Sequence, residues 1–339
     1  MTSPASTQAS QSGRIGILLS NLGTPDATDY RSVRRYLAEF LSDQRVIELP
    51  KWKWYPILYG IVLNTRPQKT GANYETIWDR ERNESPMRTI CNAQTQALAD
   101  AFANDPRICV ELGMRYGNPS IASALDRLIA QGCDRVLFVP LYPQYSATTT
   151  ATANDQLFRA LMDIRHQPTV RTSPVYYDDP AYIDALAASI EEHLATLDFE
   201  PEIVLTSYHG IPKRYATNGD PYPQQCHETT RLLRQRLGWD EKRIMTTFQS
   251  LFGREEWIRP YTEETVIRLA GEGVKRMAII TPGFSADCIE TLEEIDAEVR
   301  GIFIDKGGED FTHIPCLNTR ADGMKMIENL VRRELVGWL

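Results

Sequence analysis

The chain has 339 residues, of which 42% are hydrophobic and 24% are charged, and its formal net charge is −8. These values are typical of a globular protein with a large buried core, and the length predicts two domains. The negative charge argues against nucleic-acid binding, because no basic stripe is present to displace counterions from a phosphate backbone. Residues 1–13 are rich in Ser, Thr and Gln and predict a flexible tail rather than a signal peptide.

The six cysteines are scattered, without a C-x-x-C pair or the spacing of a zinc site. Free thiols in a reducing compartment explain this distribution, so we expect a cytoplasmic protein. No segment reaches the roughly 20 apolar residues that a membrane span requires. The segment 51–63 carries more aromatic and apolar residues than a surface loop. It predicts either a core helix, broken at Pro56 and Gly60, or an apolar lip around a pocket with peripheral contact at the inner face of a membrane.

Aliphatic runs alternate with amphipathic segments along the chain. Strands are predicted at 14–20, 109–112, 135–139, 203–206, 244–247 and 276–280. Helices are predicted after Asp29, at 92–103 and 120–129, from 147 onward, and at 180–197, 224–237 and 262–270. This alternation predicts βαβ units, parallel sheets and an α/β fold.

The sequence S-x-x-G-x-P occurs twice, at 20–25 and 207–212, each time after an aliphatic strand. The repeat predicts two similar Rossmann-like, doubly wound lobes with a cleft between them. We expect the first lobe at 14–168, the second at 169–319, and a C-terminal helix at 320–339 that packs back on both.

His209 directly follows a predicted buried strand, and Gly210 and Pro212 impose a turn after it. Open α/β sheets place their ligand chemistry just beyond the carboxyl ends of strands. The residue is therefore either a site histidine or a hydrogen-bonded histidine in a partly buried structural position.

A second polar cluster follows the strand at 276–280. Asp287, Glu290 and Glu294 are spaced i, i+3 and i+7, which places three carboxylates on one face of an α-helix. One interpretation is a solvated acidic first turn with a capping box. The other is a site, because Glu290 follows a strand in its lobe as His209 does. A histidine that faces a carboxylate across a cleft is an acid/base pair, a metal site, or both.

Seven short motifs occur in a characteristic order. They are N-L-G-T-P at 21–25, G-M-R-Y at 113–116, P-L-Y-P-Q-Y-S at 140–146, S-Y-H-G-I-P at 207–212, G-D-P-Y-P at 219–223, F-Q-S at 248–250 and the block at 284–294. With these motifs the sequence resembles the ferrochelatase family over residues 14 to about 330. The resemblance implies a lyase that inserts Fe²⁺ into protoporphyrin IX in the cleft, releases two protons and forms protohaem.

The resemblance also implies roles for individual residues. His209 and Glu290 match the catalytic and iron-binding pair, and Asp287 and Glu294 match an acidic relay for metal or protons. Whether His209 ligates iron or accepts protons stays open. The positions that match porphyrin-binding residues are Leu22, Arg66, Lys69, Tyr74, Arg115, Tyr116, Tyr142, Gln249, Ser250, Trp257 and Phe284.

Two departures from the family pattern have consequences. Cys288 stands where many relatives have a second histidine. Ala147 occupies the place of a cluster ligand, and the sequence ends without a cysteine-rich tail, so we expect no iron–sulfur cluster and no resident cofactor. A coproporphyrin or sirohydrochlorin chelatase and a non-catalytic two-lobed haem-binding protein are the alternatives. A nucleotide-binding Rossmann enzyme is disfavoured, because neither G-x-G-x-x-G nor a P-loop is present.

Overall fold

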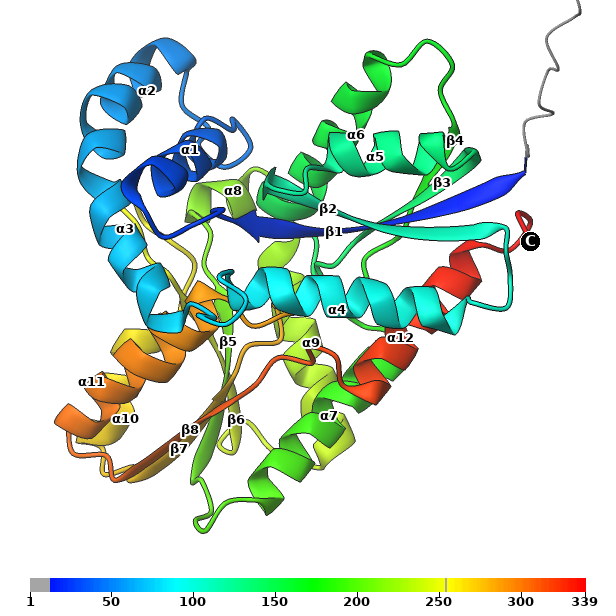
Figure 1. The fold of residues 1–339 in the computed structure, drawn as a ribbon. Coiled ribbons are helices and arrows are strands. Elements are labelled where there is room, and N and C mark those ends of the chain that lie inside the picture. Colours follow the sequence, from blue (N-terminus) through cyan, green and yellow to red (C-terminus); the bar gives the residue numbers. More distant parts are fainter. Residues whose placement is uncertain (1–12, 254) are drawn as a thin grey trace, which may run out of the picture.

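The computed structural model describes residues 13–253 and 255–339, so all but the last residue of the predicted tail lies outside it. Two four-stranded sheets, each flanked by helices, form two lobes (Figure 1). Every strand pair is parallel. The predicted α/β fold with two doubly wound lobes is confirmed.

The first sheet has the order β2-β1-β3-β4. Its strands are β1 (Arg14–Thr24), β2 (Ile108–Gly117), β3 (Cys133–Pro140) and β4 (Thr169–Thr172). The helices of this lobe are α1 (Tyr30–Leu41), α4 (Pro86–Ala101), α5 (Ile121–Ala130), the π-helix η2 (Ala147–Ala151) and α6 (Thr152–Met162).

The second sheet has the order β6-β5-β7-β8. Its strands are β5 (Ile203–His209), β6 (Ile244–Gln249), β7 (Arg276–Ile280) and β8 (Asp310–Ile314). Its helices are α7 (Pro180–Ala195), α8 (Lys213–Thr217), α9 (Tyr222–Leu237), α10 (Thr262–Gly271), the π-helix η3 (Glu290–Val299) and α11 (Arg300–Asp305).

The two sheets have the same topology. In each, the first strand along the chain is central, the second lies on one side of it, and the third and fourth follow on the other side. The two copies of S-x-x-G-x-P begin in the equivalent central strands β1 and β5. The internal repeat seen in the sequence is therefore a structural repeat.

The predicted lobe boundary at residue 168 is too early, because β4 pairs with β3 and belongs to the first sheet. Neither β4 nor β8 was expected from the sequence, since both are short and most of their residues are polar. The C-terminal helix α12 (Ala321–Glu334) packs against α4, α7 and β3, so it contacts both lobes (Figure 1).

The apolar segment forms the start of one long helical stretch: α2 (Lys51–Ile57), the π-helix η1 (Leu58–Val62) and α3 (Leu63–Ile77). The expectation that Pro56 and Gly60 break the helix was wrong. Pro56 lies inside α2, and the π-helix η1 begins two residues after it, where the hydrogen-bond register changes while the helical path continues. The Trp54 indole anchors one side by donating to the Leu41 carbonyl at 2.6 Å.

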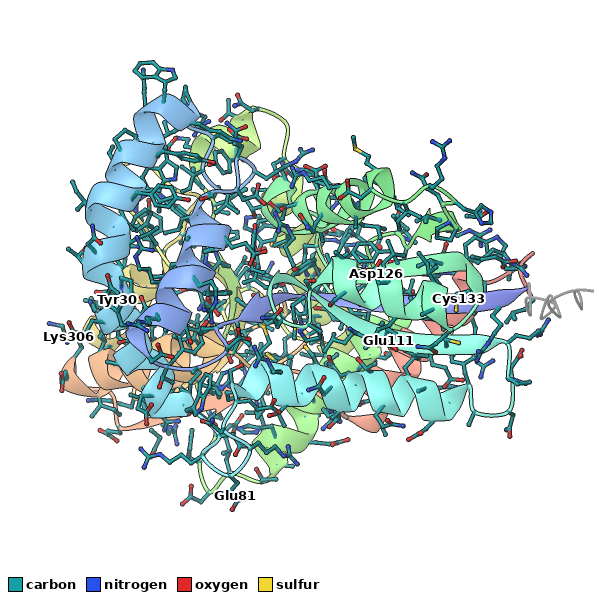
Figure 2. All side chains as sticks on the ribbon, turned by 45° about the horizontal axis from the view of Figure 1, so that its top comes forward. Tyr30, Glu81, Glu111, Asp126, Cys133 and Lys306 are labelled. Atoms are coloured by element: carbon teal, nitrogen blue, oxygen red, sulfur yellow. The ribbon has the colours of Figure 1, made fainter. Side chains whose placement is uncertain are left out.

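The lobes share a core. One hydrophobic cluster joins residues of β1 and α4 to residues of β7, α7 and α12. Side chains fill the space around both sheets, with Cys133 and Lys306 toward opposite ends of the molecule (Figure 2). In the part of the chain that the structure describes, no helix is long and apolar enough to cross a membrane.

Candidate active site

His209 is the last residue of β5 and pairs in register with Gln249 of β6. Its Nδ1 lies 2.6 Å from the Gly210 carbonyl oxygen, which can only accept, so Nδ1 carries the proton. In the neutral form of the ring, the free electron pair then lies on Nε2. A side chain at Gly210 would place its Cβ 2.9 Å from the Gln249 carbonyl oxygen, so the turn requires glycine. The Trp257 ring stands beside the imidazole, with the ring centres 6.4 Å apart.

The acidic cluster adopts a different geometry from the one predicted. Glu290 begins the π-helix η3, and hydrogen bonds between residues five apart bring Glu294 onto nearly the same face. Asp287 lies before the helix and is buried. Its carboxylate accepts from Asn318 Nδ2 at 2.6 Å and Thr291 Oγ1 at 2.9 Å. The prediction that all three carboxylates share one α-helical face was therefore wrong.

A cleft of about 540 Å³ joins the two lobes at His209. It contains six of the predicted site residues: Arg66, Lys69, His209, Ser250, Glu290 and Glu294. Its other lining residues are Thr65, Thr70, Asn73, Ile289 and Glu293. The Asn73 side-chain amide donates to Glu293 Oε1 at 2.9 Å, which ties α3 to η3 across the cleft. Asn73 was not predicted as a site residue. The spacing of polar residues in α3 was the one available indication in the sequence, and it does not show which helix the Asn73 side chain contacts.

The cleft has a cationic edge and an acidic wall. Burial lowers the pKa of Arg66, whose guanidinium lies 4.1 Å from the centre of the Phe252 ring. On the opposite side, burial raises the pKa of Glu294, while hydrogen bonds from Ser250 and the charge of His209 oppose this rise. Burial also raises the pKa of Glu293. A ligand with anionic substituents and a basic centre fits this division of charge.

Leu22 and Tyr74 lie behind Glu290 rather than in the large cleft. Together with Glu290 and Cys288 they line a small cavity of about 10 Å³. Burial raises the pKa of the Tyr74 hydroxyl, and the nearby Glu290 carboxylate adds to this effect. Tyr74 therefore stays protonated at neutral pH.

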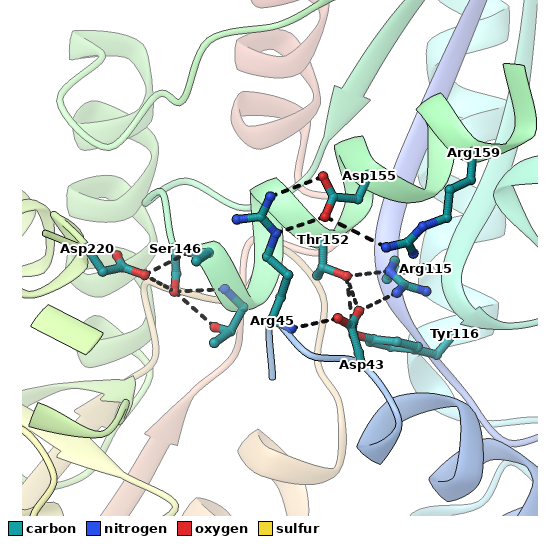
Figure 3. A network of polar contacts seen from close by, with 11 residues as sticks. Asp43, Arg45, Arg115, Tyr116, Ser146, Thr152, Asp155, Arg159 and Asp220 are labelled. Atoms are coloured by element: carbon teal, nitrogen blue, oxygen red, sulfur yellow. Dashed lines mark hydrogen bonds and ion pairs between the residues drawn. The ribbon is translucent and has the colours of Figure 1, made fainter. Parts of the chain in front are cut away.

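Arg115 and Tyr116 belong to a separate buried network (Figure 3). The prediction placed them after a strand, but β2 runs on to Gly117 and includes both. The Asp43 carboxylate accepts from the Arg115 guanidinium, from the Thr152 hydroxyl and, at 2.9 Å, from the Tyr116 hydroxyl. Arg115 also borders a second cleft of about 480 Å³, between α1 and α6.

Neither Arg115 nor Tyr116 lines the cleft at His209, and the same holds for Tyr142 and Phe284. The Tyr142 side chain is buried in the first lobe, and Phe284 packs on the core cluster shared by the lobes. That these four residues bind the porphyrin stays a prediction, and in this structure they lie outside the lining of the cleft at His209.

Within the residues described, no group of three or more His, Cys, Asp or Glu side chains is arranged to hold a metal ion. All six cysteines are buried free thiols. His209 and Glu290 line the same cleft as a two-residue set. An ion held there needs further ligands from a bound molecule.

Comparisons with known proteins identify the family of this chain. A family model described as Ferrochelatase matches residues 14–335. A ferrochelatase from Mesorhizobium japonicum is 64% identical over 327 residues, covering 96% of this chain and 93% of the relative. One from Brucella canis is 61% identical over 326 residues, with the same coverage of 96% and 93%.

Among solved structures, the sirohydrochlorin chelatase SirB from Bacillus subtilis subspecies spizizenii, in complex with cobalt, matches with a TM-score of 0.56. It is 12% identical, and the match covers 94% of each chain, which shows likeness of fold. The sequence relatives go further, because both are more than 60% identical to this chain over nearly its whole length. The chain therefore belongs to the ferrochelatase family, the lyases that insert iron into a porphyrin ring in haem biosynthesis.

Proposed function

We propose that this chain inserts Fe²⁺ into protoporphyrin IX and releases protohaem and two protons. The observation that carries the proposal is that one cleft combines two kinds of lining. Arg66 and Lys69 form its cationic edge, and His209 and Glu290 form the wall that this edge faces. The cationic edge pairs with the ring propionates. The opposite wall then meets the pyrrole nitrogens at the ring centre.

The chemistry at the ring centre requires two pyrrole protons to leave and iron to lose its water. The free electron pair on His209 Nε2 accepts a proton or binds iron, and the Glu290 carboxylate supplies charge compensation and an oxygen ligand. The porphyrin nitrogens complete the coordination that two side chains cannot supply. We propose that His209 serves both roles in succession.

Glu294 continues the acidic wall beside Glu290 and is the proposed next acceptor of protons. Its pKa is raised by burial, so it exchanges a proton more readily near neutral pH than an exposed carboxylate does. Asp287 has no such role in this proposal, because its carboxylate is occupied by donors from Asn318, Thr291 and the Cys316 N–H.

Substrate choice tests the proposal. Two basic side chains line the cleft, which matches a ring with two propionates better than coproporphyrin with four. Steady-state assays with Fe²⁺, or with Zn²⁺ as a surrogate, should give a kcat/KM for protoporphyrin at least about tenfold above that for coproporphyrin. A preference for coproporphyrin would overturn the substrate assignment, and tight haem binding without turnover would favour a haem carrier.

We also propose that the enzyme works without an iron–sulfur cluster, because its six cysteines are dispersed among core positions. The purified chain should then lack the visible absorption band and the labile sulfide of a cluster. Detection of either would contradict this part of the proposal.

A further prediction concerns the apolar lip, defined as residues 51–63, which form α2, η1 and the first residue of α3. Trp52 and Ile61 are 74% and 60% exposed, and Lys51 and Lys53 flank Trp52. Apolar side chains beside lysines suit the interface of an anionic bilayer, so we propose a cytoplasmic enzyme with peripheral membrane contact here.

In co-sedimentation with anionic vesicles, Ile61→Glu should bind at least about fivefold more weakly than wild type. Phe158→Glu, on the exposed face of α6, is the matched control and should bind as wild type does. Equal vesicle binding by wild type, Ile61→Glu and Phe158→Glu would contradict the proposal that the lip contacts the membrane.

A further inference from the structure

We infer that Arg214 and Tyr215 of α8 are positioning residues for porphyrin binding, because they hold the base of the apolar lip on the loop that follows His209. This base is the strap, defined as residues 42–50, which joins α1 to α2. The inference rests on the proposed function. It adds to that function two residues that do not line the cleft at His209.

The Tyr215 side chain connects the core of the second lobe to the strap. Tyr215 is 4% exposed and belongs to the hydrophobic cluster that includes Tyr208, the residue before His209 in β5. Its hydroxyl donates to the Val46 carbonyl oxygen at 2.9 Å and accepts from the Glu48 N–H at 3.2 Å. Because the ring is buried at one end and the hydroxyl is bonded at the other, Tyr215 acts as a fixed spacer.

Arg214 adds a charged contact at the same place. Its Nη1 donates to Glu48 Oε2 at 2.6 Å, and its Nε donates to Glu255 Oε1 at 2.8 Å. The guanidinium lies 4.8 Å from the centre of the Tyr215 ring. One planar cation thus joins a carboxylate of the strap to a carboxylate of the second lobe. The Arg214 side chain is 40% exposed, so these ion pairs act together with the Tyr215 hydrogen bonds rather than alone.

α8 is fixed close to His209. Residues 210–212 separate His209 from Lys213, the first residue of α8. Within this turn, the Ile211 carbonyl oxygen accepts from the Ile258 N–H at 3.1 Å. The turn after His209 and α8 therefore form one part of the second lobe, to which the strap is attached.

The strap is also fixed on the first lobe. The Asp43 carboxylate accepts from the Arg115 guanidinium, and Arg45 Nε donates to the Asp155 carboxylate of α6 at 2.8 Å (Figure 3). The strap therefore bridges the two lobes directly before the lip begins at Lys51.

The motif G-D-P-Y-P supplies a further link just after α8. Asp220 Oδ2 accepts from the Ser146 hydroxyl and from the Ala147 N–H, both at 2.8 Å (Figure 3). η2 begins at Ala147 and runs directly into α6, which carries the Asp155 that pairs with Arg45. The strap, α8 and α6 thus form a closed set of contacts that resists rotation of one lobe against the other.

The strap decides where the substrate-binding side chains stand. α2, η1 and α3 are one continuous helical stretch, so the strap fixes its first end, and the bond from Asn73 to Glu293 fixes its last. Arg66 and Lys69, the cationic edge, belong to this stretch and line the cleft. A firm strap holds both cations opposite His209 before the ring arrives, and such pre-organisation raises affinity by lowering the ordering cost of binding.

The variants Tyr215→Phe and Arg214→Met test the inference in steady-state assays. Phenylalanine keeps the buried ring and removes the hydroxyl alone, so Tyr215→Phe should fold as wild type does. Each variant should raise the KM for porphyrin by about fivefold and leave kcat within about twofold, because the loosened lip must be ordered on binding. Arg214→Lys keeps a charge that can pair with Glu48 and should recover part of the KM. Arg231→Met removes an exposed ion pair with Glu228 on α9 and is the control that should match wild type.

The two carboxylate partners of Arg214 separate the strap from the second lobe. Glu48→Ala should raise the KM as Arg214→Met does, whereas Glu255→Ala should keep the KM within about twofold of wild type. The reverse result would overturn the inference, because Arg214 would then act within its own lobe. A lower kcat at unchanged KM in Tyr215→Phe would overturn it as well.

Hydrogen–deuterium exchange gives a readout that does not depend on turnover. Backbone amides of the lip should exchange at least about threefold faster in Tyr215→Phe than in wild type, while those of α7 should exchange at the same rate in both proteins. An inactive wild type whose variant shows this faster exchange would refute the proposed function alone. An active enzyme with unchanged exchange in the lip of Tyr215→Phe would refute the positioning role alone.

Discussion

Replacing His209 with alanine should lower kcat for metallation by about a thousandfold, the upper part of the range for a positioned proton acceptor. His209 ends β5 with its Nδ1 proton bonded to Gly210, so Nε2 is the free acceptor in the cleft. Arg66 and Lys69 are untouched in this variant. Porphyrin binding, measured by fluorescence titration, should therefore stay within about threefold of wild type.

Two controls sharpen this prediction. His166→Ala removes an exposed histidine between α6 and β4 and should leave kcat unchanged. Added imidazole should restore part of the activity of His209→Ala, since a small base can enter the space that the side chain leaves. Retention of wild-type turnover by His209→Ala would rule out the mechanism proposed above.

Replacing Asp43 with alanine should destabilise the fold by about 3–5 kcal/mol, the cost of leaving a buried cation without its partner. Asp43 and Arg115 have side chains that are 3% and 5% exposed, and the carboxylate also holds the hydroxyls of Thr152 and Tyr116 (Figure 3). Urea unfolding at pH 7 measures the effect. The control is Asp155→Ala, which removes a carboxylate that is 29% exposed and pairs with Arg45 in the same region. This variant should lose less than about 1 kcal/mol of stability.

The contribution of the Asp43 carboxylate to the free energy of unfolding should decrease as the pH falls. Burial raises the pKa of Asp43, but hydrogen bonds from Thr152 and the Arg45 N–H, with the charge of Arg115, outweigh it and hold the pKa below its ordinary value of 3.8. A depressed pKa in the folded state means that the contribution is complete above that value and is lost as the pH falls through the folded pKa. The difference between wild type and Asp43→Ala should therefore shrink only in strong acid.

The strands were readable from the sequence where the residues are aliphatic, whereas their order in each sheet comes from the structure. β5 begins with the buried run Ile203–Leu205, β7 contains the buried run Met277–Ile280, and both strands were predicted. β4 was not, because Thr169–Thr172 lacks an aliphatic run and forms a strand through its pairing with β3. Tertiary pairing decides such short edge segments, and it cannot be seen in local composition.

The π-helices are the features of the fold that the sequence predicted least well. Spacing of i, i+3 and i+7 predicts a shared face only under α-helical hydrogen bonding. In η3 the register changes and Asp287 is held outside it by Asn318. The sequence placed His209 and Glu290 in one site, but the partners of Tyr215 and Arg115 depend on contacts between segments far apart in the chain.

The duplicated topology has a consequence for stereochemistry. The two copies of S-x-x-G-x-P put Leu22 and His209 at matching positions, a hydrocarbon group in one lobe and a base in the other. Only His209 lines the large cleft, because Leu22 borders the small cavity behind Glu290, so a ring bound in the cleft meets the base from one side. Protoporphyrin IX has an unsymmetrical rim and hence two enantiotopic sides, so the enzyme should metallate it from one of them consistently.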